Sequence, residues 1–328
     1  MSVRVATYNL FEGAGGSYNR LVEFVRTSQL DVICLQEING WEDNDFARLK
    51  DFTDKVLFVG FAYGNSNTEY KLATVSKHAI IDRKLHAEAF WHAALEIKVR
   101  LGDRDVTIVN AHLDPWKEES RDREIARLLS GLQPGQPTII TGDFNSLSRQ
   151  DNYPPELLAQ LQAKGISKFG TQSLELRVID RLLAAGYVDV FAAAGQFQPT
   201  VPSAFNQDKD HEVPVRVDYM FVSPDLAPLV SKVELAKTDL TDAISDHYPL
   251  IVTFNLGEPE TGTSPTSAAP APVMPPAPVP APVAPSIPAA PPTPWVPPED
   301  PKPQERPPKN DDKPDDGEVV MWSHDDKK

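Results

Sequence analysis

The chain has 328 residues, and most of its 32 prolines lie after Leu256. This distribution predicts one domain over residues 1–256, long enough for a sizeable core, followed by a tail over residues 257–328. The chain carries 47 Asp and Glu against 32 Lys and Arg, and residues 1–256 are acidic on their own. This balance argues against a protein that grips long duplex DNA by its phosphates. The single cysteine, Cys34, excludes an intramolecular disulfide and is expected in the core.

The N-terminal residues enter a strand-like sequence directly, with no basic region followed by an apolar one. No stretch of the sequence is long and apolar enough to span a bilayer. We therefore expect a soluble, cytoplasmic monomer without stable membrane insertion.

Segments rich in Val, Ile, Thr and aromatic residues alternate with segments of helical periodicity up to residue 256. In chain order, strands are predicted at residues 3–9, 31–37, 70–77, 92–101, 105–113, 137–145, 215–223 and 249–256, and helices at residues 19–28, 118–132, 155–163 and 174–185. Because the helices interrupt the strands irregularly, a simple parallel doubly wound sheet fits poorly. The pattern predicts an α/β fold in which two packed central β-sheets are flanked by helices.

The tail has a different composition from the domain. Pro, Ala and Val dominate residues 268–298, and Asp, Lys and Pro dominate the residues after 299. We expect a disordered linker and solubilising tail over residues 257–328. An alternative is a docking element for a protein partner, in which Pro-rich segments bind an aromatic groove and Trp322 acts as an anchor.

Polar side chains of related chemistry lie at the ends of the predicted strands. The most informative fragments are Gly142-Asp143-Phe144-Asn145 and Ser245-Asp246-His247. Because side chains alternate along a strand, Asp143 and Asn145 should point to one side and Phe144 into the core. Such carboxylates, amides and imidazoles suit the binding of a hard cation and the transfer of a proton. Further residues of this kind at or near strand ends are Asn9, Glu37, His112 and Asp218.

Six short strings occur in one order along the domain: TYN, LQE, AHLD, GDFN, VDYMFVSP and SDHYPL. This ordered set resembles the endonuclease/exonuclease/phosphatase superfamily, the metal-dependent phosphohydrolases related to pancreatic-type DNase, abasic-site endonucleases, neutral sphingomyelinases and inositol polyphosphate 5-phosphatases. The resemblance spans about residues 3–256. It implies a four-layer α/β-sandwich with the active site at one end of the two central sheets.

The resemblance also implies a metal site. Glu37 is similar to the principal carboxylate ligand of Mg²⁺ or Mn²⁺ in the family, with Asn9 and Asp246 nearby as ligands or ligand supports. These ions prefer oxygen ligands and retain several waters. Zinc is not expected, because the implied ligands are oxygens and the sequence shows no Cys/His cluster.

The remaining residues are implied to carry the catalysis. Asp143 is similar to the residue that orients or deprotonates the attacking water, and Asn145 to the one that positions this water and the phosphate. His247, oriented by Asp218, resembles the imidazole that acts on the phosphoryl group or its water. His112 resembles a phosphate stabiliser or general acid.

Each of these residues also has a structural alternative. Asp143 can form a turn, Asp218 can pair with Arg216, His112 can be a satisfied edge histidine, and Asn9 can cap a turn. The ordered occurrence of all of them favours the catalytic interpretation.

The sequence predicts a divalent-metal-dependent phosphodiesterase, nuclease-like, acting on a phosphodiester substrate such as nucleic acid. One alternative is a phospholipid, inositol-phosphate or nucleotide phosphohydrolase. A second is a catalytically silent scaffold that acts through the Pro-rich tail, although all the expected catalytic residues are present. The loop after AHLD lacks the insertion of abasic-site endonucleases, and the chain lacks the long apolar hairpin of membrane-acting sphingomyelinases. Glu69 or Lys71 is a candidate for a further polar residue of the site.

Overall fold

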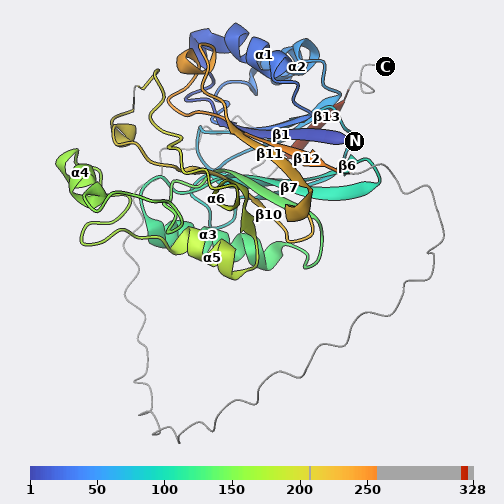
Figure 1. Cartoon of the computed structure of the whole chain (residues 1–328). Coiled ribbons are helices and arrows are strands. Elements are labelled where there is room, and N and C mark those ends of the chain that lie inside the picture. The colour runs from blue at the N-terminus through green and yellow to red at the C-terminus, as the bar shows by residue number, and fades with distance from the viewer. Residues whose placement is uncertain (207, 257–318, 324–328) are drawn as a thin grey trace, which may run out of the picture. The chain divides into compact units, whose positions relative to one another are not determined.

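The structure is a computed structural model that describes residues 1–206, 208–256 and 319–323. Within these residues, two mixed β-sheets of seven and six strands pack face to face. Helices cover the outer face of each sheet, so that four layers follow one another in Figure 1. This arrangement confirms the α/β-sandwich expected from the sequence.

The seven-stranded sheet is centred on a parallel pair near the N-terminus. β1 runs parallel to β2 and antiparallel to β12, which is the last strand of the predicted domain. The strand order is β11 (Val230–Leu235), β12 (Leu250–Asn255), β1 (Ser2–Asn9), β2 (Val32–Gln36), β4 (Leu72–Ser76), β3 (Gly60–Gly64) and β13 (Val319–Ser323).

The six-stranded sheet has its own parallel pair, β7 and β8. β10 runs antiparallel to β8 and places Asp218 opposite Asp143. The strand order is β5 (Ile80–His86), β6 (Ala93–Leu101), β7 (Arg104–His112), β8 (Thr138–Asp143), β10 (Asp218–Val222) and β9 (Val188–Asp189).

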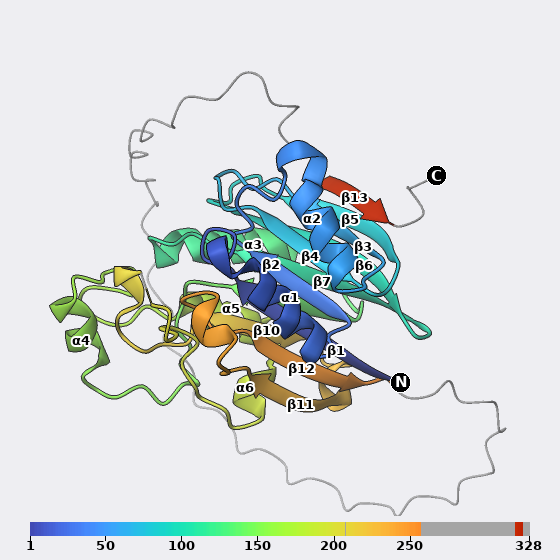
Figure 2. The same ribbon diagram turned by 90° about the horizontal axis from the view of Figure 1, so that it is seen from above.

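The outer layers consist of helices with one apolar face. In α1, the buried residues Leu21, Phe24 and Val25 recur at the spacing of one helix face. Figure 2 shows α1 and α2 lying along the outside of the seven-stranded sheet. The α-helices are α1 (Tyr18–Thr27), α2 (Asp43–Lys55), α3 (Glu118–Gly131), α4 (Leu157–Ala163), α5 (Arg177–Ala184) and α6 (Val190–Ala193), and the 3₁₀ turns are η1 (Gly15–Ser17), η2 (Lys209–His211), η3 (Ala227–Leu229) and η4 (Thr241–Ala243).

Three apolar clusters correspond to the three interfaces between layers. One includes residues from both sheets, such as Val5 and Ile108. The second joins the seven-stranded sheet to α1 and α2, and the third joins the six-stranded sheet to α3 and α5. Cys34 lies in the first cluster as a buried free thiol, as expected.

The predicted strands and helices up to residue 256 are all present, with shifts of a few residues at their ends. The sequence patterns missed β3, β5, β11 and α2, as well as the short elements β9 and α6. β5 and β11 are polar strands at or next to sheet edges, and α2 buries only three side chains. Neither kind of element carries a strong apolar period, so sequence patterns detect them poorly.

The expectation of a wholly disordered tail is wrong at residues 319–323, which form β13. The short apolar sequence there provides a pleated face that a neighbouring strand can bury. The predictions made for residues 257–318 and 324–328 lie outside the described residues.

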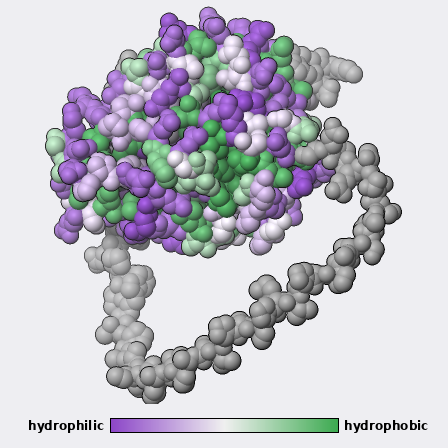
Figure 3. Space-filling model, viewed as in Figure 1, coloured by the Kyte–Doolittle hydropathy of each residue, from purple (hydrophilic) through white to green (hydrophobic). Residues whose placement is uncertain are grey.

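Among the described residues, no helix is both long enough and apolar enough to cross a membrane. Figure 3 shows hydrophilic residues over most of one face, with hydrophobic residues gathered near its middle. The exposed tryptophans Trp91 and Trp116 are 43% and 56% accessible.

Candidate active site

The ends of four strands and the start of a fifth bring the predicted residues together. Asn9 ends β1, and Glu37 follows the parallel strand β2. His112 ends β7 directly opposite Asp143 at the end of β8, and β10 places Asp218 on the other side of Asp143. The carboxyl ends of parallel strands in both sheets therefore meet at one end of the sandwich.

The GDFN fragment can turn here because of its glycine. Gly142 has a φ of 136°, and a Cβ at this position would lie 1.9 Å from the carbonyl oxygen of Ala111. The two parallel strands β7 and β8 approach each other closely only because that Cβ is missing. Phe144 is buried in the core as predicted, whereas Asp143 and Asn145 belong to the site.

Asn9 connects carboxylates from the two sheets. Its Nδ2 donates to Oε1 of Glu37 at 3.0 Å and to Oδ2 of Asp143 at 3.1 Å. Its Oδ1 accepts a hydrogen bond from the backbone N–H of Phe11 at 3.0 Å, which sets the orientation of the amide. Asn9 therefore supports the two carboxylates in this arrangement.

Glu37 is held with its side chain largely buried. Its backbone lies in the left-handed region with a φ of 57°, and its Oε2 accepts from the N–H of Glu12 at 3.1 Å. Burial raises the pKa of Glu37 to about 7, against the opposing hydrogen bond from Asn9. A carboxylate destabilised by desolvation gains most from a nearby cation.

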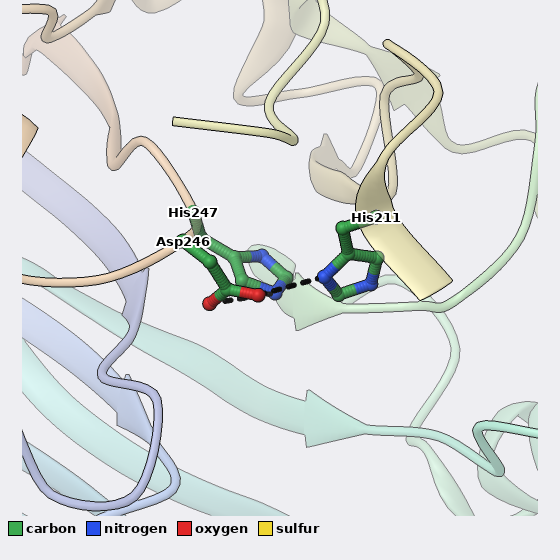
Figure 4. A group of neighbouring side chains, drawn as sticks. All are labelled: His211, Asp246 and His247. Atoms are coloured by element: carbon green, nitrogen blue, oxygen red, sulfur yellow. Dashed lines mark hydrogen bonds and ion pairs between the residues drawn. The ribbon is translucent and has the colours of Figure 1, made fainter. Parts of the chain in front are cut away.

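Two histidines on one side of the site each contact a carboxylate. Nδ1 of His247 lies 2.8 Å from Oδ2 of Asp218, and Nδ1 of His211 lies 2.8 Å from Oδ2 of Asp246. Figure 4 shows His211 facing Asp246 and His247 from a separate segment of the chain. We refer to these four residues as the paired wall.

The carboxylates determine the charge of His247. Burial alone would lower its pKa, but Asp218, Asp246 and Asp143 together raise the pKa of His247 to about 10. Its Nε2 lies 3.8 Å from Oδ2 of Asp143 and 3.9 Å from Oδ1 of Asp246. His247 is therefore a cation at neutral pH, and it points toward the residues expected to act on water and metal.

On the opposite side of the site, His92 and His112 stack on each other. Their ring centroids are 4.0 Å apart at an interplanar angle of 14°, and Thr68 Oγ1 lies 2.6 Å from Nδ1 of His92. Nε2 of His112 lies 3.6 Å from Oδ2 of Asp143. We refer to His92 and His112 as the stacked wall.

The stacked wall is neutral. Burial, together with the positive charge of His247 and Lys168, lowers the pKa of His112 to about 3. Burial likewise lowers the pKa of His92 well below its ordinary value. His112 Nδ1 is buried and has no hydrogen-bond partner among the described residues.

A buried lysine links Asn145 to the paired wall. Nζ of Lys168 lies 3.1 Å from Oδ1 of Asn145 and 3.0 Å from Nε2 of His211. Donation to Nε2 leaves Nδ1 of His211 as the N–H that donates to Asp246. Arg121 in turn donates to the backbone carbonyl of Lys168 at 2.6 Å, so the core of the domain holds this loop.

The alternative role for Asp218 does not apply. Arg216 forms buried ion pairs with Asp151 and Asp189, each at 2.7 Å, and Asp218 contacts His247 instead. Of the two further candidates, Lys71 donates to the carbonyl oxygen of Ser66 at 2.9 Å, and Glu69 is exposed.

Sequence reasoning missed His92, His211 and Lys168. His92 is the first residue of the strand predicted at 92–101, but it lies outside the six short sequence strings that resemble the family. His211 ends the 3₁₀ turn η2 and Lys168 lies in a loop, and neither follows a strand, so only the tertiary structure identifies them. The expected absence of a cluster with histidine ligands is wrong for the described residues. His211, Asp246 and His247 offer three ligand atoms within 4.8 Å of one another, as do Asp143, Asp218 and His247.

The donor chemistry of the site fits a divalent cation. Glu37, Asp143 and Asp246 supply carboxylate oxygens around Asn9 and His247. An excess of buried carboxylates is stabilised by a cation in the same space.

Residues 6–247 match the Endonuclease/Exonuclease/phosphatase family. The uncharacterized protein YbhP of Escherichia coli K12 is 24% identical over 189 residues, which are 49% of this chain and 73% of YbhP. An AP endonuclease from Archaeoglobus fulgidus has a TM-score of 0.59 at 16% identity and covers 77% of this chain and 100% of its own. A humanized TDP2 of D. rerio has a TM-score of 0.55 at 16% identity, with coverage of 77% and 99%. The chain belongs to the Endonuclease/Exonuclease/phosphatase family.

Proposed function

We propose that the chain is a divalent-metal-dependent phosphodiesterase of the nuclease-like type. The observation that carries this proposal is the direct contact of Asp143 with groups on every side of the site. Its Oδ2 is 3.1 Å from Asn9 Nδ2, 3.6 Å from His112 Nε2 and 3.8 Å from His247 Nε2. One carboxylate thus sits between a neutral imidazole, a cationic imidazole and an amide that also contacts Glu37.

Glu37 and Asp246 are the residues that would hold Mg²⁺ or Mn²⁺, with Asn9 as a support. Such an ion neutralises charge on a phosphate oxygen and on the leaving oxygen. Glu37→Ala should weaken metal binding by at least about tenfold, since loss of a ligand costs no less than loss of a supporting residue. Isothermal titration calorimetry with Mn²⁺ measures this independently of activity, and unchanged affinity would contradict the assignment.

Asp143 is the group that orients the attacking water and accepts its proton. Its Oδ1 is held by the backbone N–H of Asn145 at 2.9 Å, so the carboxylate has a defined direction. The side chain of Asn145 is anchored by Lys168 and would position the water and the phosphate.

The two walls support different roles for their histidines. His247 carries a proton at neutral pH and would bind a phosphate oxygen as a cation. His112 is neutral and has no proton to release as a strong acid, so it would stabilise the phosphate by hydrogen bonding. Of the two roles implied for His112 by resemblance, this favours the stabiliser.

Hydrolysis of a p-nitrophenyl phosphodiester with Mg²⁺ or Mn²⁺ tests the proposal directly. EDTA should abolish the activity and added metal should restore it. Absence of activity with every metal and substrate class would favour the alternative of a silent scaffold.

Two exposed tryptophans support nucleic acid as the substrate class. The backbone N–H groups of Trp91 and Asp114 both donate to Glu124, and the N–H of Trp116 donates to Asp114, so the two tryptophans belong to neighbouring segments, and Trp91 directly precedes His92 of the stacked wall. Exposed aromatic rings can stack on unpaired bases, which suits an acidic domain that makes few phosphate contacts.

A parallel screen distinguishes this class from the alternatives. Supercoiled plasmid, single-stranded DNA, RNA, sphingomyelin and inositol phosphates are compared, with Asp143→Asn as the blank. Trp91→Ala and Trp116→Ala should raise KM for single-stranded substrates with little change in kcat, and leave p-nitrophenyl phosphodiester hydrolysis unchanged. Brisk head-group release from sphingomyelin without plasmid nicking would favour the phospholipid alternative.

A further inference from the structure

The last described strand, β13, lies at the edge of the seven-stranded sheet, far along the chain from its neighbours. It pairs antiparallel with β3 over five residues, from Val319 opposite Gly64 to Ser323 opposite Gly60. Residues 256–318 separate it in sequence from β12. Figure 2 shows β13 beside β3 and β5, at the opposite edge of the sheet from β11.

The side chains of β13 alternate between the two faces of the sheet. Val320 and Trp322 pack against the cluster beneath α1 and α2, whereas Val319 packs against the cluster between the sheets. The ring of Trp322 stacks on that of Phe61, with centroids 5.6 Å apart at 21°. Such a pair adds a specific contact to the main-chain ladder.

An arginine on β5 contacts the same strand. Nε of Arg83 donates to the carbonyl oxygen of Val319 at 3.1 Å, and its Nη1 lies 3.8 Å from the sulfur of Met321. Three features of the domain therefore hold β13, namely the backbone hydrogen bonds of β3, the ring of Phe61 and the guanidinium of Arg83.

The backbone of β3 is adapted to this neighbour at Gly60. A Cβ there would lie 2.4 Å from the carbonyl oxygen of Trp322, and the next two atoms it would meet also belong to β13. At Gly64, by contrast, a Cβ would meet Leu85, Leu95 and Leu72. Gly60 thus lets β13 approach.

The exposure of the two strands differs sharply. All five residues of β3 are buried, but every residue of β13 is at least partly exposed, and Met321 is 39% accessible. β3 is already paired with β4 along its full length. β13 therefore covers a sheet edge that would otherwise be open, and its own side chains pack at the margin of the core.

We propose that the edge of β3 is a strand-docking site whose ligand is the segment Val319–Ser323 of the same chain, which docks and releases while the domain stays folded. The mode is addition of an extended peptide to a sheet edge, where main-chain hydrogen bonds supply affinity and alternate side chains supply specificity. Because this segment is covalently linked to its docking site, docking within one chain is favoured over docking between chains at low concentration.

The docking site continues into the candidate active site. After Gly64, opposite Val319, the chain runs to Ser66, which accepts from Lys71, and to Thr68, which contacts His92 of the stacked wall. Release of β13 is therefore expected to loosen residues 65–70.

Hydrogen–deuterium exchange on the full chain tests docking through Gly60→Ala, with Gly16→Ala as the matched control because a Cβ at Gly16 meets nothing within 4 Å. Gly60→Ala should raise exchange in residues 60–64, 65–70 and 319–323 at least tenfold and leave β1 and β2 unchanged. If exchange rises throughout the domain, or in none of these segments, the proposal is wrong.

A second variant prevents β13 from docking and leaves the edge of β3 intact. In the full chain carrying Val320→Asp and Trp322→Ala, a fluorescent peptide of residues 317–325 should bind, and the same peptide with Trp322→Ala should bind at least tenfold more weakly. Wild type should bind the peptide more weakly than the variant, since its site is filled. Absence of binding to the variant would overturn the proposal. Light scattering that shows a wild-type dimer and a Gly60→Ala monomer would overturn the same-chain assignment in favour of a second copy.

Discussion

The paired wall and the stacked wall each contain two buried histidines, but their imidazoles differ in charge. In the paired wall, three carboxylates raise the pKa of His247 to about 10, although burial opposes them. In the stacked wall, burial and nearby positive charge lower the pKa of His112 to about 3. His211 shows that contact with a carboxylate does not by itself keep a buried imidazole charged, because burial and the adjacent Lys168 lower the pKa of His211 despite Asp246.

The difference shows that the charge of a buried histidine depends on the combined effect of its burial and of the charges of all its neighbours. Asp143 lies between the walls and contacts one histidine of each. The site thus combines a fixed cation and a neutral hydrogen-bonding group around one carboxylate, which is an arrangement suited to a phosphodiester.

The largest effect is expected where both walls meet. Asp143→Asn should lower kcat by about 10²–10⁴-fold, the usual loss for a general base, with metal binding largely retained. Steady-state hydrolysis at saturating Mg²⁺ and calorimetry with Mn²⁺ measure the two quantities. Asp103→Asn at an exposed loop is the matched control. Near-normal turnover of Asp143→Asn would show that its assigned role is wrong.

Removing a carboxylate from the paired wall should lower the pKa of His247 and so bring its charge state closer to that of His112. Asp218→Asn eliminates the strongest attraction on the imidazolium, so the pKa of His247 should fall from about 10 toward neutrality, and kcat should fall by about 10²-fold. NMR titration of the imidazole in the metal-free protein measures the pKa. If the pKa stays near 10, Asp246 and Asp143 alone determine the charge.

Substitutions in the stacked wall should lower kcat less than substitutions in the paired wall. His112→Gln keeps a hydrogen-bond donor but loses the ring that stacks on His92, and we expect kcat to fall by about tenfold, the worth of one hydrogen bond. His112→Ala should be worse than His112→Gln. Equal kcat values for the two variants would show that hydrogen bonding by His112 does not contribute.

The smallest effect on turnover is expected at Glu124, which accepts from the backbone of residues next to the stacked wall. There the pH dependence of the free energy of unfolding should change instead. Burial raises the pKa of Glu124 to about 7 from an ordinary value of 4.5. The folded state therefore binds more protons than the unfolded state between these values, and stability falls as pH rises through this window. Urea unfolding should show that Glu124→Gln reduces the difference in unfolding free energy between pH 5 and pH 8 by on the order of 3 kcal/mol. An unchanged difference would contradict the shifted pKa.

The sequence by itself was enough to predict the sandwich and to name the eight residues that the structure then brings to one end of it. Strands with clear apolar patterns were predictable because burial on both faces demands Val, Ile and Leu. Residues such as Asn9, Glu37 and Asp143 follow those strands, so their meeting at one end follows from strand direction. The peripheral elements β5, β11 and α2 were missed because weak apolar periods do not distinguish them from loops.

Only the tertiary structure decided the features that depend on contacts between distant segments. His211 in the 3₁₀ turn η2 and Lys168 in a loop have positions that the sequence pattern does not specify. They are identified by two contacts, 3.0 Å between Lys168 Nζ and His211 Nε2 and 2.8 Å between His211 Nδ1 and Asp246 Oδ2. The opposite charges of His247 and His112 likewise depend on which carboxylates surround each ring. β13 joins β3 across residues 257–318, and pairing of strands so far apart in sequence is decided by packing, because local propensity carries no information about the partner.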